Sequence, residues 1–247
     1  MSMDSIVSNS SGYDQSVDWV PLSLTFVEYP KGDVFGKLLA LFSLTPFVIL
    51  SGFVSLILFR RDLHTITFFI GVLLNEICNT VLKHILREPR PLARNTNLLY
   101  SEYGMPSSHS QFMWFFASYM LYFTFIRLQY ANNKAFKEFF WKVAGAASCI
   151  AIACIVSYSR IFLQYHTWKQ VIYGALFGII IGTVWFTIIN VVLTPYFPTV
   201  ISWKISELFL LRDTTLIPNV LWFEYTNIRH EAGARARRRK SISAKSQ

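Results

Sequence analysis

Three short clusters of residues in this chain carry the side chains that phosphoryl transfer requires. Together they supply cationic groups, small hydroxyl-bearing residues and two histidines, and each lies at an end of a long apolar segment. Such a set can bind a phosphate, attack its phosphorus and protonate the leaving oxygen. The apolar setting indicates that the phosphate belongs to a lipid. The clusters are Lys83 with Arg90-Pro91, Pro106-Ser107-Ser108-His109, and Ser159-Arg160 with His166.

Each type of side chain suits one part of this chemistry. The guanidinium of Arg160 can bind two phosphate oxygens at once, which the ammonium of Lys83 cannot do. Two histidines can divide the work, because one attacks phosphorus while the other protonates the leaving group and then activates water. The positive charges meet the main electrostatic demand, so we predict a reaction without metal or cofactor. The nearby carboxylates Glu88 and Glu102 are isolated and form no magnesium cluster.

Taken singly, the clusters also have structural interpretations. Ser107 suits the N-cap position of the helix that follows it. Lys83 and Arg90 are typical of basic residues that extend from a helix end to the membrane surface, and a lone His109 at a helix start is more often solvated. The occurrence of all three clusters in one chain favours the catalytic interpretation over these alternatives.

The elements that must position the clusters are predicted to be membrane-spanning helices. The chain has 247 residues, of which 53% are hydrophobic and only 15% charged, and this composition predicts an all-α integral membrane bundle in one domain. Gly174, Gly178 and Gly182 recur every four residues in the last span, which predicts close approach to a neighbouring helix. The five predicted spans are about Phe35 to Phe59, His64 to Leu86, Ser110 to Leu128, Val143 to Phe162 and Thr167 to Leu193.

Basic residues between the spans predict the topology. They fall between spans one and two, between spans three and four, and in the C-terminal tail, so the positive-inside rule makes these regions cytoplasmic. The N-terminal tail (1–33), the loop 87–109 and the turn 160–167 then share the lumenal side. Residues 34–194 form the predicted transmembrane domain, and residues 195–247 form a cytoplasmic interfacial segment with a basic tail facing anionic lipid. Nucleic-acid binding by this tail is not predicted, because it lacks aromatic stacking partners.

The motifs Lys-x6-Arg-Pro, Pro-Ser-x-His and Ser-Arg-x5-His, in this order, resemble those of the type 2 phosphatidic acid phosphatase superfamily. The resemblance covers about Lys83 to Gln170 and the surrounding spans. It implies a metal-independent helical bundle in which His166 is the nucleophile and His109 the acid. The implied phosphate-binding residues are Lys83, Arg90, Ser107 and Arg160, joined by Ser108, which stands where the family usually has glycine.

One departure from the family pattern concerns the nucleophile. The family has an aspartate four residues after this histidine, and here the position is Gln170, whose amide oxygen can still accept from the imidazole and set its tautomer. The glutamine, the short length and the basic C-terminus are similar to a branch that removes one phosphate from dolichyl diphosphate, a polyprenyl diphosphate carrier of glycans, in the endoplasmic reticulum membrane. The alternatives are a phosphatase for phosphatidate or sphingoid-base phosphates, and a non-catalytic phospholipid-binding protein.

Overall fold

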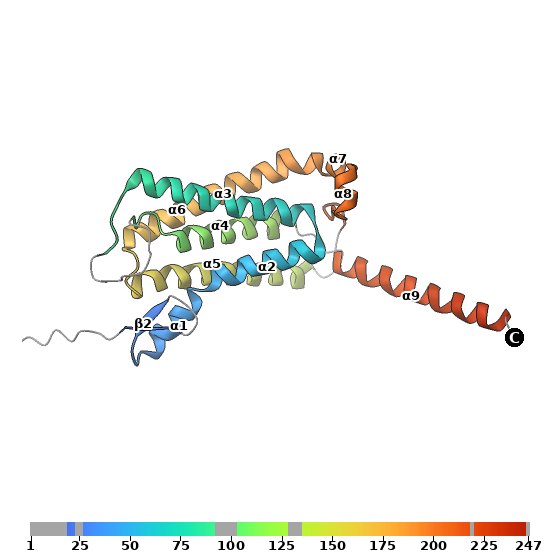
Figure 1. The fold of residues 1–247 in the computed structure, drawn as a ribbon, viewed down its shortest axis with the longest axis horizontal. Coiled ribbons are helices and arrows are strands. Elements are labelled where there is room, and N and C mark those ends of the chain that lie inside the picture. Colours follow the sequence, from blue (N-terminus) through green and yellow to red (C-terminus); the bar gives the residue numbers. More distant parts are fainter. Residues whose placement is uncertain (1–18, 23–26, 92–102, 128–134, 218–219, 246–247) are drawn as a thin grey trace, which may run out of the picture.

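The computed structural model describes residues 19–22, 27–91, 103–127, 135–217 and 220–245, and these residues are mainly helical (Figure 1). A short antiparallel hairpin, β1 and β2, precedes the helices. The elements are β1 (Trp19–Pro21), β2 (Glu28–Pro30), α1 (Val34–Phe42), α2 (Thr45–Arg60), α3 (Leu63–Leu86), α4 (Ser108–Tyr122), α5 (Ala135–Phe162), α6 (Trp168–Thr187), α7 (Phe197–Ile201), α8 (Lys204–Leu208) and α9 (Val220–Lys245), with π-helical turns at Phe123–Arg127 and Ile188–Leu193 and a 3₁₀ turn at Thr194–Tyr196.

Helix α4 lies at the centre of the bundle and packs against α6, α5, α3 and α2. Its closest neighbour is α6, because the predicted glycine row faces it. A Cβ added to Gly174 would lie 2.8 Å from the backbone oxygen of Ser107, and one added to Gly178 or Gly182 would collide with atoms of α4. The absence of side chains therefore lets the two helix backbones touch, and the predicted close approach is confirmed.

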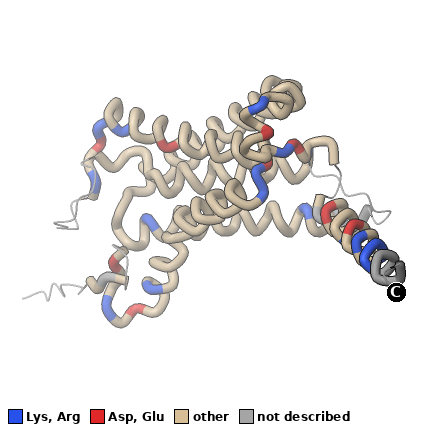
Figure 2. The backbone as a smooth tube through the Cα atoms, turned by 45° about the vertical axis from the view of Figure 1, so that its right-hand side comes forward, with Lys and Arg blue, Asp and Glu red and all other residues tan. Residues whose placement is uncertain are grey.

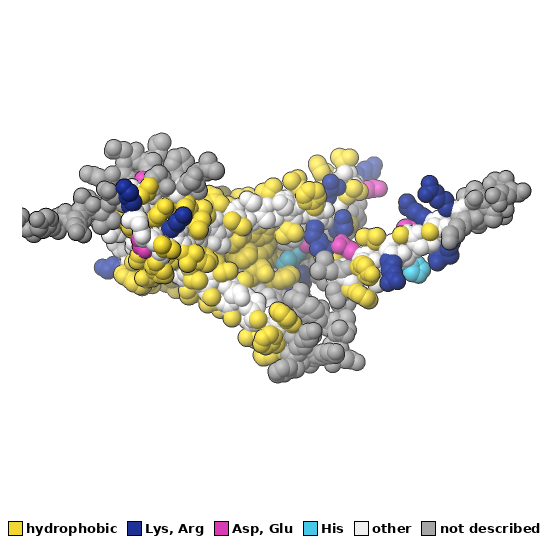
Figure 3. All heavy atoms as spheres, turned by 90° about the horizontal axis from the view of Figure 1, so that it is seen from below, with side chains coloured by type: hydrophobic (Ala, Val, Ile, Leu, Met, Phe, Trp, Pro, Cys, Tyr) yellow, Lys and Arg dark blue, Asp and Glu magenta, His cyan; other side chains and the backbone are white. Residues whose placement is uncertain are grey.

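The outward faces of the other helices are apolar. Figure 3 shows hydrophobic side chains over the middle of the bundle, with Lys and Arg toward its ends. Because apolar groups exposed on this scale need lipid around them, the protein is a multi-pass membrane protein. Within the described residues, four helical stretches are long and apolar enough to span: Val34–Arg60, Leu63–Leu86, Phe139–Phe162 and Trp168–Ile201.

Three predicted spans differ from the observed helices. The first is divided, because α1 ends at Phe42 and α2 begins at Thr45, with Pro46 in its first turn. The third is the 15-residue α4, which is too short to count as a span by itself and continues as a π-helical turn to Arg127. The fifth does not end at Thr194-Pro195, because helical turns continue to Ile201. Pro195 lies in the first turn of a helical segment, where a backbone N–H would have no partner within the helix, so the missing N–H of proline costs no hydrogen bond.

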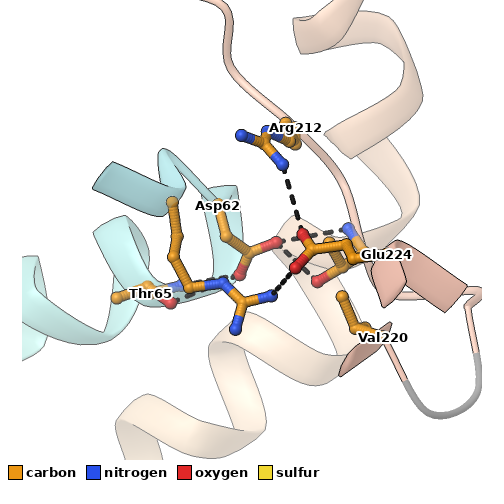
Figure 4. Close-up of a pocket in the computed structure, with 7 residues that line it drawn as sticks. Asp62, Thr65, Arg212, Val220 and Glu224 are labelled. Carbon is orange, nitrogen blue, oxygen red and sulfur yellow. Dashed lines mark hydrogen bonds and ion pairs between the residues drawn. The ribbon is translucent and has the colours of Figure 1, made fainter. Parts of the chain in front are cut away.

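Charged residues tie α9 to the end of the bundle formed by the α2–α3 turn. Figure 2 shows Lys and Arg gathered toward the two ends of the bundle and along α9. Glu224 of α9 accepts from Arg60 at 3.1 Å and from Arg212 at 3.2 Å (Figure 4). Beside it, the Asp62 carboxylate accepts from the Thr214 hydroxyl at 2.6 Å. These residues line a small pocket, and their ion pairs and hydrogen bonds fix the start of α9.

Candidate active site

The structure brings the three predicted clusters to the opposite end of the bundle, next to the N-terminal hairpin (Figure 1). The ends of α3 and α5 and the starts of α4 and α6 meet there. The backbone N–H of Ser107, before α4, donates to the carbonyl oxygen of Gln170 in α6 at 3.0 Å. This bond joins the second cluster directly to the third.

Ser107 occupies the N-cap position of α4, but its side chain does not cap the helix. The hydroxyl is fully buried and has no hydrogen-bond partner among the described residues. The capping interpretation of this side chain is therefore wrong. A buried hydroxyl without a partner is costly unless a ligand satisfies it, and the start of a helix favours an anion.

Lys83 reaches the same helix start from α3. Its Nζ donates to the Ser108 hydroxyl at 2.8 Å. A glycine, which the family usually has at this position, would leave that ammonium without this partner, so the serine gives Lys83 a fixed place. The first and second clusters are thus in direct contact, as phosphate binding requires.

A buried network of amides holds α3 against α4 below this contact. The Gln111 Nε2 donates to the backbone oxygen and to Oδ1 of Asn75, both at 3.1 Å. The Asn79 Nδ2 donates to Gln111 Oε1 at 2.8 Å and to the Pro106 carbonyl at 3.4 Å. Sequence reasoning missed Gln111, although an amide in an apolar helix four residues after Ser107 is a usable signal.

The end of α5 shapes the third cluster. The Arg160 carbonyl accepts from the backbone N–H groups of Tyr165 and His166 at 3.0 and 3.1 Å. The Arg160 guanidinium carbon lies 4.0 Å from the centre of the Tyr165 ring, and the Tyr165 hydroxyl accepts from the Glu28 backbone N–H of β2 at 3.1 Å. The hairpin thereby fixes Tyr165, and Tyr165 orients the guanidinium of Arg160, a residue that is only 3% exposed.

Gln170 contacts His166 as the sequence predicts. The distance from His166 Nδ1 to Gln170 Oε1 is 3.1 Å, and both side chains are buried. The same Oε1 accepts from the Thr167 backbone N–H at 3.3 Å, and the Gln170 Nε2 donates to the Pro89 carbonyl at 2.8 Å. These partners assign the amide orientation, so Nδ1 of His166 carries the proton and Nε2 keeps a free electron pair. That is the tautomer a nucleophile needs.

The surroundings of His166 favour its neutral form. Burial, followed by the positive charges of Arg160 and Arg90, holds the pKa of His166 well below the usual range of an imidazole. The hydrogen bond to Gln170 raises this pKa and only partly opposes the other effects. A neutral imidazole is the form able to attack phosphorus.

The second histidine lies in the same electrostatic environment. His109, in the first turn of α4, is half-buried, and its charge interacts with those of Arg160, His166 and Lys83. Its ring lies edge-on to that of Phe47, with 6.3 Å between centroids. His109 therefore lies within range of the charges of Lys83, Arg160 and His166.

One contact of Glu88 is not predicted by the sequence. Its Oε1 accepts from the Gln170 Nε2 at 3.5 Å. The register of the segment after α3 against α6 creates this contact, and the sequence carries no signal of that register. Glu102, the other carboxylate considered, lies outside the described residues.

Known proteins are similar to this chain over most of its length. The model of the PAP2 superfamily matches residues 64–192. The chain is 51% identical to dolichyldiphosphatase 1 of Rhinolophus ferrumequinum and 50% identical to that of Homo sapiens, each over 220 residues, which are 89% of this chain and 92% of the relative. It is 38% identical over 234 residues to lipid phosphate phosphatase gamma of Arabidopsis thaliana, covering 91% of this chain and 95% of the relative. The comparison with solved structures found no match.

Proposed function

The chain belongs to the PAP2 superfamily, and we propose that it is an integral membrane enzyme that hydrolyses dolichyl diphosphate to dolichyl monophosphate and inorganic phosphate. The observation that carries this proposal is a buried histidine whose Nδ1 is hydrogen-bonded to Gln170 and which lies among the charges of Lys83, Arg90 and Arg160. Such a site can neutralise a diphosphate and present Nε2 to its terminal phosphorus.

In the first step, His166 Nε2 attacks the terminal phosphorus, and the bond to the bridging oxygen breaks. His109 gives its proton to that oxygen, and dolichyl monophosphate leaves. A phosphohistidine remains on His166. Lys83, Arg90 and Arg160 stabilise the charge on the equatorial oxygens, which is the main demand of phosphoryl transfer.

In the second step, water attacks the phosphohistidine. His109, now without its proton, takes one from the water, and the phosphorus–nitrogen bond breaks to release phosphate. The unsatisfied Ser107 hydroxyl and the Ser108 hydroxyl on Lys83 are suited to hold the phosphoryl oxygens through both steps. The dolichyl monophosphate becomes available again as a carrier of glycans for N-glycosylation.

Trapping the covalent intermediate tests this mechanism. Purified protein, given substrate labelled with ³²P on the terminal phosphate and quenched in base, should carry an acid-labile label. The label should be absent in His166→Ala, and His84→Ala is the matched control, because that histidine is exposed on α3 and bonds its own helix at Thr80. A His166→Ala protein with near wild-type turnover would make the nucleophile assignment wrong.

The rival substrates are phosphatidate and sphingoid-base phosphates, and the name of the Arabidopsis relative, lipid phosphate phosphatase gamma, is consistent with such a wider class of lipids. A panel in detergent micelles separates them. We expect the highest kcat/KM for dolichyl diphosphate. A preference for phosphatidate at equal micellar mole fraction would replace the proposed substrate, and no turnover of any lipid phosphate would favour a binding protein.

The proposal places the active site on the lumenal face of the endoplasmic reticulum membrane and α9 on the cytoplasmic face. The basic residues of α9, Arg235, Arg237, Arg238 and Arg239, support this orientation through the positive-inside rule. Exposed Trp222 and Ile228 near its start suit the membrane interface, and the arginines suit anionic lipid. In sealed microsomes, protease should remove a C-terminal tag and spare an N-terminal one, whereas the reverse result would invert the orientation.

A further inference from the structure

We propose that Glu88 is a positioning residue for His166, which acts through the Gln170 amide and supplies the carboxylate that the family motif carries at position 170 itself. The inference rests on the proposed role of His166 as nucleophile. It concerns one of the six unspecified positions between Lys83 and Arg90 in the first motif, and it accounts for a glutamine at a position where the family pattern has a charge.

The first observation is that every polar position of the Gln170 amide has a partner. Its Oε1 faces His166 Nδ1 at 3.1 Å and the Thr167 N–H at 3.3 Å. Its Nε2 faces the Pro89 carbonyl at 2.8 Å and the Glu88 carboxylate at 3.5 Å. A 180° flip of the amide would place its donor against Nδ1–H and its acceptor against two oxygens. Glu88 and Pro89 therefore hold the oxygen toward the histidine.

The second observation is that the backbone around Glu88 is itself fixed. Helix α3 ends at Leu86, and its C-cap residue Arg87 has left-handed backbone (φ 49°) and donates its N–H to the Lys83 carbonyl at 3.0 Å. The Glu88 carbonyl accepts from the Gly104 N–H at 2.7 Å, and Pro89 forms an antiparallel bridge with Tyr103. Backbone hydrogen bonds therefore hold the chain before and after Glu88, and they fix the position from which its side chain reaches Gln170.

The third observation is electrostatic. The charged and titratable groups facing His166 are Lys83 on α3, Arg90 after it, His109 on α4 and Arg160 on α5, which are all cationic or neutral. Glu88 brings a negative charge to the far side of the amide. A carboxylate that accepts from Nε2 polarises the amide and makes Oε1 a stronger acceptor. The amide then stabilises the positive charge that develops on the imidazole during attack.

A double-mutant cycle between Glu88 and Gln170 tests the proposal. Glu88→Gln keeps the size and an acceptor oxygen but removes the charge. In the wild-type background we expect kcat on dolichyl diphosphate to fall about fivefold, since a charge-assisted hydrogen bond is roughly twice as strong as a neutral one. The acid limb of the kcat/KM profile should move to lower pH, because His166 loses a group that favours its protonated form.

In a Gln170→Asp background the same Glu88→Gln change should have little effect. The introduced carboxylate accepts directly from Nδ1–H of His166, and it has no N–H that could donate to Glu88. Glu231→Gln is the matched control for loss of one carboxylate, since Glu231 pairs with exposed Arg235 on α9, far from the site. Thermal unfolding of each variant separates loss of fold from loss of positioning.

Equal losses from Glu88→Gln in both backgrounds, or an unmoved acid limb, would overturn the role of Glu88 and leave the proposed function intact. An absence of lipid diphosphatase turnover in the wild-type protein would instead reject the proposed function, and the inference would fall with it.

Discussion

The glycine at position 104 allows a sharp test of how the Gln170 amide is held. A Cβ at Gly104 would lie 2.8 Å from both Nε2 and Oε1 of Gln170 and 3.0 Å from Cγ of Arg90. Ordinary contacts of a Cβ begin at 3.4 Å. Gly104→Ala therefore requires the amide or the loop to retreat by about 0.6 Å, since hard-core overlap cannot be tolerated in a packed site.

The cost follows from the geometry around His166. Its Nδ1 is 3.1 Å from Gln170 Oε1, so a retreat of the amide by this amount takes the pair beyond hydrogen-bonding distance. Because a misplacement of about 1 Å can cost on the order of 10²-fold in rate, we expect kcat to fall roughly tenfold. Overpacking should lower the free energy of unfolding by about 1–3 kcal/mol.

The assay is turnover of dolichyl diphosphate by purified protein in detergent micelles, together with thermal unfolding. Gly145→Ala is the matched control, because a Cβ there meets nothing within 4 Å. In a Gln170→Asp background, the side chain is one methylene shorter, so Gly104→Ala should reduce kcat by about twofold at most, since the two changes occupy the same space. Wild-type kcat for Gly104→Ala, or an equal loss in both backgrounds, would refute the reasoning.

Three further predictions concern the reacting groups. Gln170→Leu leaves the Nδ1–H of His166 without its acceptor, so turnover should fall roughly 10- to 100-fold at all pH values, since a buried unsatisfied donor costs about 1–3 kcal/mol; equal activity of the two proteins would show that Gln170 does not orient His166. Gln170→Asp should be active and should raise the pKa of His166, so that the acid limb of kcat/KM moves to higher pH, and a shift to lower pH would contradict this sign. Activity should survive EDTA, because Lys83, Arg90 and Arg160 supply the positive charge, whereas loss of turnover that magnesium restores would reject the mechanism.

The helices and the candidate site residues could be predicted from the sequence because their signals are local. Long apolar segments predict helices directly, and the spacing of His166 and Gln170 places them one helical turn apart. The segment from Thr167 to Gln170 also matches a capping box, and the structure contains both of its hydrogen bonds. One amide therefore caps α6 and orients the histidine just before that helix.

The features that were missed depend on contacts between segments. The Gln111 contacts with Asn75 and Asn79 require a particular register of α3 on α4, and the Glu88 contact requires a particular path of the chain after α3. Periodicity identifies which residues share a helix face, but it does not define how two faces are aligned. The break between α1 and α2 near Ser43 and the continuation of helical turns beyond Pro195 were also not predicted, since short breaks and π-helical turns leave the apolar pattern unchanged.

The glycine row of α6 connects this packing to the chemistry. Because Gly174 has no side chain, the Ser107 carbonyl oxygen can come within 2.8 Å of the position that a Cβ of residue 174 would occupy. At that separation the Ser107 N–H can donate to the Gln170 carbonyl at 3.0 Å, so the start of α4 is fixed to the start of α6. The serines and His109 belong to the first helix, and Gln170 with its hold on His166 belongs to the second. A small-residue pattern that predicts only helix packing therefore also sets the distance between the groups that we propose bind phosphate and the histidine that we propose attacks it.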